Sequence, residues 1–271
     1  MDRTVEATEI RRRNNVTELG NPAGRPMIFA HGFGCNQHAW QRVVPHFLDD
    51  FRVILFDHVG SGASDLAAYD RGKYDSLHGY ASDTVKIVNE LDLRDVVFVG
   101  HSVSSMIGVL AANSDPSRFG ALVLLGPSPR YINDEHYVGG FEQADIEGLL
   151  DALDANYLGW SASIAPMIMG QPDNPELGLE LVDSFCSTDP VIARHFAHVT
   201  FLSDNRSDLE AVSVPTLILQ AKEDSIAPEV VGQFVHAQIA GSTYALIDAY
   251  GHCANLSEPD EVAMRIKAYL A

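Results

Sequence analysis

The chain has 271 residues, of which 46% are hydrophobic and 20% are charged, and its formal net charge at pH 7 is −19. These proportions are typical of a globular protein with a large core, and they exclude fibrous, collagen-like and disordered classes. A charge this negative repels both nucleic acid and the anionic face of a membrane, so we expect neither as a partner.

Cysteine usage and hydropathy predict a cytoplasmic protein without a metal site. The three cysteines lie far apart and form no C-x-x-C pair, so neither a zinc site nor a redox dithiol is expected. Residues 1–13 contain three consecutive arginines and lack the apolar stretch of a signal peptide. No run of about 18 apolar residues, the length of a membrane-spanning helix, occurs in the chain.

Short apolar runs, each followed by turn residues, recur along the chain and predict strands that are buried on both faces. These runs occupy residues 26–30, 52–56, 95–99, 121–125, 215–220 and 243–247. Stretches of helical period separate several of them, including residues 79–91, 104–113 and 228–238. This alternation predicts an α/β fold, with a mainly parallel sheet that carries helices on both faces.

Residues 131–205 interrupt this alternation. They contain no convincing strand, but their apolar residues recur at helical spacing, and a structureless loop of this length would be improbable in a compact domain. We therefore expect a helical insertion between two core strands. Pro166, Pro172, Pro175 and Pro190 are expected to divide it into several short helices.

The strongest local motif surrounds Ser102. A predicted strand ends at Gly100, a helix begins near Val103, and Ser102 occupies the sharp turn between them. This arrangement is typical of the G-x-S-x-G elbow, in which a serine hydroxyl is held above a sheet. The last glycine of that motif is Ser104 here, which is a mild departure because serine is also small.

A serine hydroxyl needs a base to act as a nucleophile, and the base needs a group that orients it. Asp224 follows one predicted strand and His252 follows the next, so the order is serine, acid, histidine. The carboxyl ends of parallel strands open onto one crevice, so these three side chains are expected to converge there.

The loop His31–Gly34, with the sequence HGFG, directly follows the first predicted strand. Acyl transfer passes through a tetrahedral oxyanion, which two preset backbone N–H groups can stabilise. The N–H groups of Phe33 and Val103 are the candidates for this oxyanion hole.

Other residues near these motifs have simpler interpretations. Asp57 and Asp248 are rival acids that are less well placed than Asp224, and His101 is interpreted as a packed residue of the elbow. Residues 60–62 favour a plain turn over a phosphate loop, because their spacing matches neither glycine-rich phosphate motif. Cys253 is interpreted as a spectator thiol.

Five apolar side chains are candidates for a substrate pocket, although the four in the insertion could equally be core. They are Phe33, Trp160, Ile164, Phe196 and Phe201.

With these motifs assembled, the chain resembles the α/β-hydrolases, and more narrowly the RsbQ-like group of bacterial stress-signalling hydrolases, which is related to the strigolactone and karrikin receptors of plants. The segments that carry the resemblance are HGFGC (31–35), RVILFDHVGSGASD (52–65), VFVGHSVS (97–104), GPSPRYIND (126–134), GGFE (139–142), FCSTDPVIAR (185–194) and GHC (251–253). The departure at Ser104 is shared by this group. Residues 1–14 match the group poorly, and no function is assigned to them.

The resemblance implies a hydrolase core formed by residues 1–130 and 206–271, with a four-helix lid formed by residues 131–205 over a closed apolar pocket. It implies a Ser102, Asp224 and His252 triad. With these residues we expect an acyl-enzyme mechanism that needs no cofactor or metal, and a small, largely apolar ester or lactone as the substrate. It also implies a stress-signalling role with a PAS-domain serine phosphatase as partner.

Three alternatives to signalling by hydrolysis remain open at this stage. The chain could be a ligand receptor with slow turnover, a general carboxylesterase, or a carbon–carbon bond hydrolase that uses the same three residues. Haloalkane and epoxide hydrolases are disfavoured, because they carry an aspartate at the position of Ser102.

Overall fold

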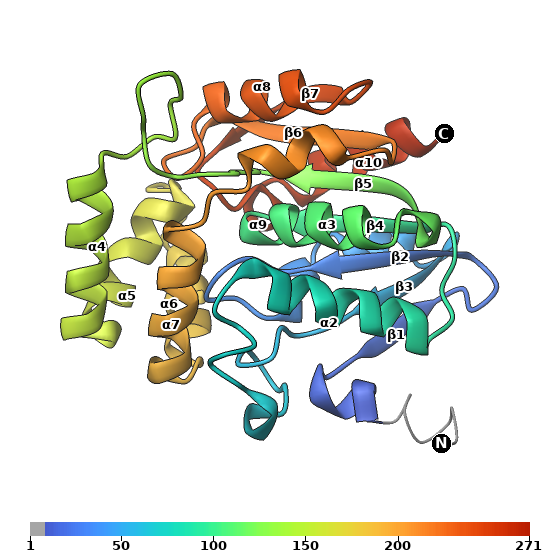
Figure 1. Cartoon of the computed structure of the whole chain (residues 1–271), viewed down its shortest axis with the longest axis horizontal. Coiled ribbons are helices and arrows are strands. Elements are labelled where there is room, and N and C mark those ends of the chain that lie inside the picture. The colour runs from blue at the N-terminus through green and yellow to red at the C-terminus, as the bar shows by residue number, and fades with distance from the viewer. Residues whose placement is uncertain (1–8) are drawn as a thin grey trace.

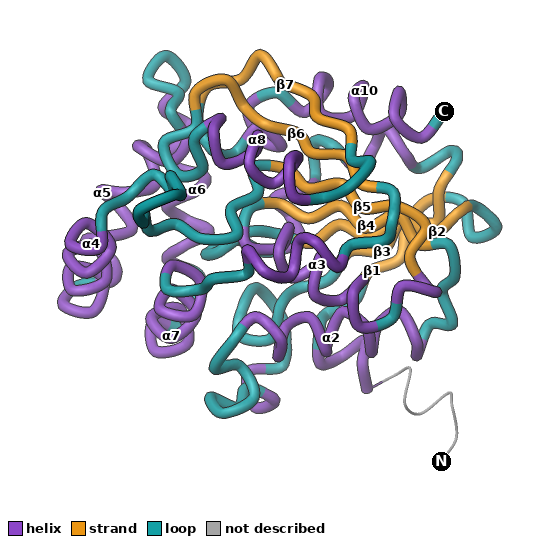
Figure 2. The backbone as a smooth tube through the Cα atoms, turned by 45° about the horizontal axis from the view of Figure 1, so that its top comes forward, coloured by secondary structure: helices purple, strands orange, loops and turns teal. Residues whose placement is uncertain are grey.

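The computed structural model of the chain describes residues 9–271. The expectations for the first eight residues lie outside the described range. A seven-stranded sheet crosses the middle of the molecule, with helices on both of its faces (Figure 2). Its strand order is β1-β3-β2-β4-β5-β6-β7, and all neighbours are parallel except β1 and β3. This confirms the predicted α/β fold with a mainly parallel sheet.

The strands are β1 (Thr17–Gly20), β2 (Arg25–Ala30), β3 (Phe51–Leu55), β4 (Val96–His101), β5 (Phe119–Leu125), β6 (Thr216–Glu223) and β7 (Thr243–Tyr250). The longer helices are α2 (Leu77–Glu90), α3 (Val103–Ser114), α4 (Gln143–Ala155), α5 (Tyr157–Met169), α6 (Pro175–Cys186), α7 (Pro190–Phe201), α8 (Glu229–Gln238) and α10 (Pro259–Leu270), and a short helix, α9, spans Ala254–Ser257. None of the helices in the described range has the length and hydropathy that crossing a membrane requires.

Alternation along the central strands divides the core into two apolar clusters. Ile28 and Phe98 face the cluster that contains α2, α3 and α8. Phe29 and Val99 face the opposite cluster, which contains α10 and the short helical turns after β2. Because successive side chains point to opposite faces, a strand covered by helices on both sides must be apolar at every position. This requirement explains why continuous apolar runs predicted the strands.

The segment between β5 and β6 contains α4, α5, α6 and α7. These four helices lie together beyond the carboxyl ends of the central strands (Figure 1). Pro175 and Pro190 start α6 and α7, as expected for a residue that lacks an N–H. The prediction that Pro166 also divides helices is wrong, because Pro166 lies inside α5.

Strand β4 and helix α3 approach each other closely at Gly100. A methyl group at residue 100 would lie 2.4 Å from the carbonyl oxygen of Ser104, which is too short for any carbon–oxygen contact. The glycine therefore permits the sharp turn that carries Ser102, and a side chain there would push the helix away from the strand.

We predict that Gly100→Ala lowers the free energy of unfolding by about 1–3 kcal/mol, because strand and helix must move apart. The measurement is urea unfolding followed by circular dichroism. Gly148→Ala is the matched control: Gly148 lies in α4, a methyl group there would meet nothing within 4 Å, and helix propensity favours alanine by about 1 kcal/mol. If both variants unfold at the same urea concentration, the close approach at Gly100 does not constrain the fold.

Candidate active site

Ser102 lies in a strained turn between β4 and α3. Its backbone has φ 57° and ψ −125°, a conformation that L residues seldom adopt and that costs on the order of 1–3 kcal/mol. The Ser102 N–H donates to the carbonyl of Leu125 on β5, and the Ser105 N–H donates to the carbonyl of Ser102. These bonds hold the turn that carries the Ser102 side chain.

His252 connects Ser102 to Asp224. Its Nε2 lies 2.7 Å from the Ser102 Oγ, and its Nδ1 lies 2.7 Å from the Asp224 Oδ2. All three residues are buried, although they come from the loops after three different strands. The structure therefore brings together the three side chains that the sequence singled out.

Asp224 is held as an acceptor by several donors. Burial by itself would raise the pKa of Asp224, but the charge and hydrogen bond of His252 and the N–H groups of Ala227 and Ile226 hold that pKa below its usual value. The carboxylate therefore stays charged at neutral pH. Its Oδ2 can accept a hydrogen bond from the Nδ1–H of His252, which leaves the lone pair of Nε2 free to receive the Ser102 proton.

The rival acids make other contacts. Asp57 is buried, and its carboxylate accepts bonds from Asn15, the Gln37 N–H and the Ala63 N–H, so it holds a turn together. Asp248 is exposed and pairs with Lys222 at 2.8 Å. Of the three acids, Asp224 is the one in contact with His252.

His101 packs beneath His252 and supports its backbone. The two rings lie 4.9 Å apart, and the His101 Nε2 lies 2.9 Å from the carbonyl oxygen of His252. Burial, with a smaller contribution from the nearby His252, lowers the pKa of His101 to about 3, so its ring is neutral at physiological pH. A neutral ring in this position can donate to the His252 carbonyl.

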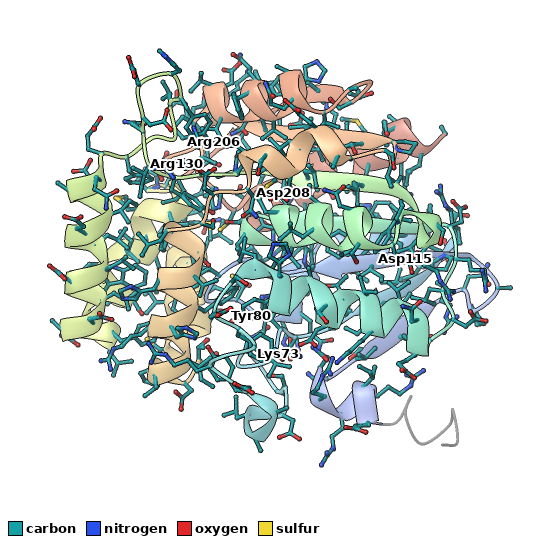
Figure 3. The ribbon with its side chains drawn as sticks, viewed as in Figure 1. Lys73, Tyr80, Asp115, Arg130, Arg206 and Asp208 are labelled. Atoms are coloured by element: carbon teal, nitrogen blue, oxygen red, sulfur yellow. The ribbon has the colours of Figure 1, made fainter. Side chains whose placement is uncertain are left out.

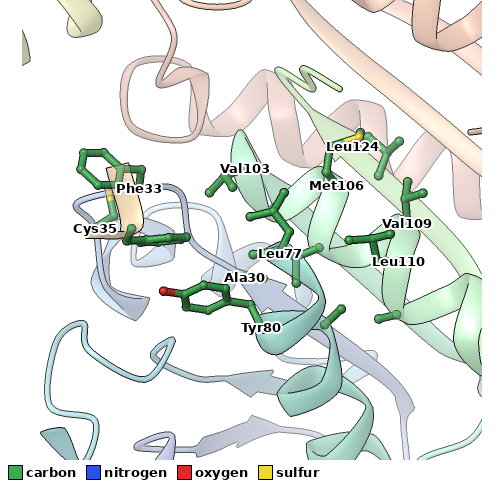
Figure 4. Close-up of a cluster of buried hydrophobic side chains, with 14 of the residues drawn as sticks. Ala30, Phe33, Cys35, Leu77, Tyr80, Val103, Met106, Val109, Leu110 and Leu124 are labelled. Carbon is green, nitrogen blue, oxygen red and sulfur yellow. The ribbon is translucent and has the colours of Figure 1, made fainter. Parts of the chain in front are cut away.

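The two candidate oxyanion donors lie on the elbow and on the loop after β2. Val103 is the first residue of α3, and the first N–H groups of a helix have no acceptor within it. The Phe33 N–H makes no backbone hydrogen bond within residues 9–271. Figure 4 shows Phe33 on the loop after β2 and Val103 at the start of α3.

A cavity of about 30 Å³ lies beside Ser102 and His252. A volume of this size holds little more than one water molecule. Phe33 and Phe201 of the predicted pocket residues line it, whereas Trp160, Ile164 and Phe196 are not among its lining residues. Further lining residues are Gly32, Cys35, His101, Tyr131, Ile168, Leu181, Phe185, Thr200, Ile226 and Cys253. Among them, the sequence motifs singled out Gly32 in the HGFG loop, His101 as a packed residue of the elbow and Cys253 as a spectator thiol.

The cavity is apolar apart from a few groups. Burial raises the pKa of Tyr131 to about 12, and that of Cys35 also to about 12, so both groups are protonated at neutral pH. Burial likewise raises the pKa of Cys253 well above its usual value. The buried hydroxyl of Thr200 has no hydrogen-bond partner among the described residues. Within the same range, no cluster of three or more metal-binding side chains is present.

Trp160 and Phe196 instead extend the aromatic packing around the cavity. Trp160 stacks on Phe185 at 5.9 Å, and Phe196 stacks on Tyr80 of α2 at 4.4 Å. Trp160 contacts the ring of Phe33 edge-on, and Phe196 contacts it at a tilt. They therefore support the cavity wall without forming its surface.

We predict that Asp224→Asn slows covalent labelling of Ser102 by a fluorophosphonate about 10³- to 10⁴-fold, because an amide stabilises the wrong tautomer of His252. The measurement is the labelling rate by intact-protein mass spectrometry. Asp248→Asn is the control, since this exposed carboxylate contacts Lys222 and is expected to leave the rate unchanged. Equal rates for the two variants would contradict the assignment of Asp224.

Comparison with known proteins identifies the family. The model of the "Alpha/beta hydrolase family" matches residues 27–265. The chain is 38% identical over 250 residues to a karrikin insensitive 2 receptor of Petunia hybrida, covering 92% of each, and 35% identical over 257 residues to a strigolactone esterase of Arabidopsis thaliana, covering 94% of this chain and 96% of the relative. A hydrolase from Oleispira antarctica has a similar structure, with a TM-score of 0.95, 41% identity and 97% coverage of both chains. The chain therefore belongs to the α/β-hydrolase family.

Proposed function

We propose that this member of the α/β-hydrolase family hydrolyses a small, largely apolar ester or lactone. The observation that carries the proposal is the buried chain of hydrogen bonds from Ser102 through His252 to Asp224, with both distances at 2.7 Å. The similarity to proteins named as strigolactone esterases supports the same class of reaction.

The reaction follows from the roles that these atoms can take. The Nε2 of His252 accepts the Ser102 proton as the Oγ attacks the carbonyl carbon, while Asp224 stabilises the imidazolium. The N–H groups of Phe33 and Val103 bind the tetrahedral oxyanion. His252 then protonates the leaving alcohol, and a water molecule, activated by the same imidazole, releases the acid from Ser102.

The cavity lining supports an apolar substrate with a few hydrogen-bonding atoms. Aromatic and aliphatic side chains form most of its wall, so a charged substrate would lose its hydration without compensation. The hydroxyls of Tyr131 and Thr200 are the groups that could bind an oxygen atom of the substrate. An unpaired buried hydroxyl such as that of Thr200 is costly, and a ligand acceptor would offset that cost.

The helices α4 to α7 act in this proposal as a lid, with residues 1–130 and 206–271 as the hydrolase core. A cavity of about 30 Å³ is too small for an ester of even modest size, so the lid must move before a substrate can enter. A movement of α5 would also shift His252, because the His252 N–H donates to the carbonyl of Ile168 near the end of α5.

The ends of the proposed lid are held together by ion pairs. Arg130 bonds to Asp204, and Arg206 bonds to both Asp204 and Asp134, so each arginine joins the entry of the segment to its exit (Figure 3). The hydrogen bond from Arg206 lowers the pKa of Asp204, and the same arginine lowers that of Asp134. These pairs favour a hinge in which the two connecting segments, around residues 130–134 and 204–206, stay together while the helices move.

A second set of contacts holds α6 against the core. Arg42 forms a bidentate ion pair with Glu180, with N···O distances of 3.1 and 2.7 Å. The Ser184 hydroxyl donates to the carbonyl of Gly34 on the loop after β2. We define these contacts as the α6 latch. They join the proposed lid to the loop that carries the Phe33 oxyanion donor.

Ligand sensing is the second candidate function. Relatives at 34–38% identity include proteins named as karrikin insensitive 2 receptors. A small cavity lined in part by α5, α6 and α7 suits a protein that reports occupancy by changing shape. As a ligand sensor, the protein would turn its ligand over slowly, and the conformation of the lid with ligand bound would be what a partner recognises. A role in stress signalling, with a PAS-domain serine phosphatase as the reader, rests on the RsbQ-like resemblance of the sequence.

Two further parts of the proposal rest on chemistry. A carbon–carbon bond hydrolase would use the same three side chains, and a panel of esters, lactones and diketones would separate it from an esterase. We propose the cytoplasm as the working compartment, since the three cysteines are free thiols and such thiols suit a reducing environment.

We predict that Ser102→Ala abolishes hydrolysis of p-nitrophenyl acetate and butyrate, because the nucleophile is removed. Absorbance of p-nitrophenol measures the rate, and thermal unfolding checks that the variant is folded. Hydrolysis at the wild-type rate by folded Ser102→Ala would overturn the proposal. If the ligand still raises the melting temperature of this variant and preserves the downstream readout, sensing rather than turnover is the function.

We predict that Arg42→Met raises kcat/KM for p-nitrophenyl butyrate by up to about fivefold, because a half-exposed ion pair contributes at most about 1 kcal/mol to closure. Arg265→Met, which removes a similar pair with Glu261 inside α10, is the control and is expected to change nothing. An unchanged or lower kcat/KM in Arg42→Met would show that the α6 latch does not limit access.

A further inference from the structure

A buried chain of hydrogen bonds runs beneath the two candidate oxyanion donors. We propose that Ser104 and His58 are positioning residues that set the separation between the N–H groups of Phe33 and Val103. The inference rests on the proposed hydrolase function, since it concerns the oxyanion hole of that reaction. It assigns a role to the serine that stands where the elbow motif ends in glycine.

The contacts link three segments of the chain. The Ser104 Oγ lies 2.5 Å from the carbonyl oxygen of His31, and the His58 Nε2 lies 2.8 Å from the same Oγ. The His58 N–H donates to the Nε2 of His31 at 3.1 Å. All three residues are at most 1% exposed. The loop after β2, the loop after β3 and the first turn of α3 are thus joined by side-chain hydrogen bonds.

The direction of each bond follows from the number of protons available. Ser104 has one hydroxyl proton, which goes to the His31 carbonyl because that oxygen can only accept. The Nε2 of His58 must therefore donate to the Oγ. The Nδ1 of His58 then carries a lone pair, and it has no hydrogen-bond partner within the described residues.

The position of the ring proton on His31 follows in the same way. Its Nε2 accepts from the His58 N–H, so the ring proton is on Nδ1, which lies 2.9 Å from the carbonyl oxygen of Gly32. Burial lowers the pKa of His31, and it lowers that of His58 well below the usual value, so both rings are neutral. The whole chain of bonds then has one consistent arrangement of protons.

This arrangement connects the two donors mechanically. Ser104 directly follows Val103 in α3, and the carbonyl of His31 is one residue removed from the N–H of Phe33. The bond between Ser104 and His31 therefore joins the backbone that carries one donor to the backbone that carries the other. An oxyanion is stabilised only when both N–H groups lie about 2.7–3.1 Å from it, so their separation must be held closely.

His58 holds Ser104 in the required rotamer. Its ring lies against Tyr80 at 5.6 Å and against Phe196 at 6.2 Å, so α2 and α7 keep it in place. Because its Nε2–H is donated to the Ser104 Oγ, the hydroxyl proton is directed to His31. The bond to His31 thus depends on a side chain that neither enters the cavity nor touches Ser102.

The neighbouring Ser105 provides a matched comparison. It is also fully buried in the first turn of α3, and its hydroxyl also donates to a main-chain carbonyl, that of Gly100 at 2.9 Å. The same hydroxyl also lies 3.5 Å from the carbonyl oxygen of Leu125 on β5. Neither contact reaches the loop after β2. Removing the Ser105 hydroxyl therefore costs a similar hydrogen bond without releasing the Phe33 donor.

The test compares Ser104→Ala and Ser104→Gly with Ser105→Ala in hydrolysis of p-nitrophenyl butyrate by the full chain. We expect both Ser104 variants to lower kcat about tenfold to a hundredfold, with KM within a factor of about two, because misplaced groups lose transition-state binding. Inhibition by phenylboronic acid, whose tetrahedral adduct resembles the oxyanion, should weaken by a similar factor. Ser105→Ala keeps the Ser105 N–H bond to the Ser102 carbonyl, so it should lower kcat much less than either Ser104 variant.

His58 variants test whether the effect passes through this bond. His58→Gln keeps an N–H donor and is expected to retain most of kcat, whereas His58→Leu removes the donor and is expected to behave like Ser104→Ala. Thermal unfolding of every variant identifies any that fails to fold. The kcat values of the remaining Ser104 and His58 variants are then compared.

Amide NMR shifts separate this inference from the proposed function, because they need no turnover. Ser104→Ala should move the Phe33 and Val103 amide signals, and Ser105→Ala should leave the Phe33 signal in place. If the wild type hydrolyses no ester while the shifts move as expected, the function fails and the positioning role stands. Equal losses of kcat in Ser104→Ala and Ser105→Ala, or unmoved Phe33 and Val103 signals in Ser104→Ala, would overturn the positioning role.

Discussion

The sharp turn between β4 and α3 is the constraint on which the rest of the site depends. Ser102 adopts φ 57° there, and the conformation persists because Gly100 lets the helix lie against the strand and because Leu125 accepts the Ser102 N–H. A strained backbone persists only where its surroundings determine it from several sides. The turn sets two things together, the position of the Ser102 hydroxyl and the direction of the Val103 N–H at the start of α3.

The sequence predicted what depends on local pattern. Strands β2 to β6 were predicted because residues buried on both faces must be apolar. Strand β7 was predicted from its apolar run, although it is an edge strand in which only Ile247 and Ala249 are buried. Asp224 and His252 were predicted because each follows a predicted strand. Strand β1 was missed, because it is an antiparallel edge strand whose four residues are half-buried or exposed. Pro166 was expected to end a helix, but α5 continues through it and packs there against Gly178 of α6. Packing between helices outweighed the local preference.

The lining of the cavity was the least predictable part of the site. Thr200, Phe185 and Leu181 reach it from α6 and α7, and which side of a helix faces the core is set by how the helices pack on one another. No spacing in the sequence encodes that packing directly. The departure at Ser104 was a usable signal, although only the structure reveals that its hydroxyl bonds to the His31 carbonyl.

The reacting groups are already assembled beside a cavity of only about 30 Å³. Ser102, His252 and Asp224 are already within hydrogen-bonding distance, while the cavity beside them is too small for a substrate. The rate of hydrolysis would then be governed by how often the helices α4 to α7 open, and less by assembly of the reacting groups. The same property suits a sensor, because occupancy and lid position would be linked.

Intact-protein mass spectrometry of the chain, quenched within the first turnover of p-nitrophenyl butyrate, tests the central claim most directly. The account predicts a butyryl adduct at one site per chain, located on Ser102 by peptide mapping, together with a burst of p-nitrophenol of matching size. Hydrolysis that proceeds with no adduct on Ser102, or with the adduct on another residue such as Cys253, would contradict it.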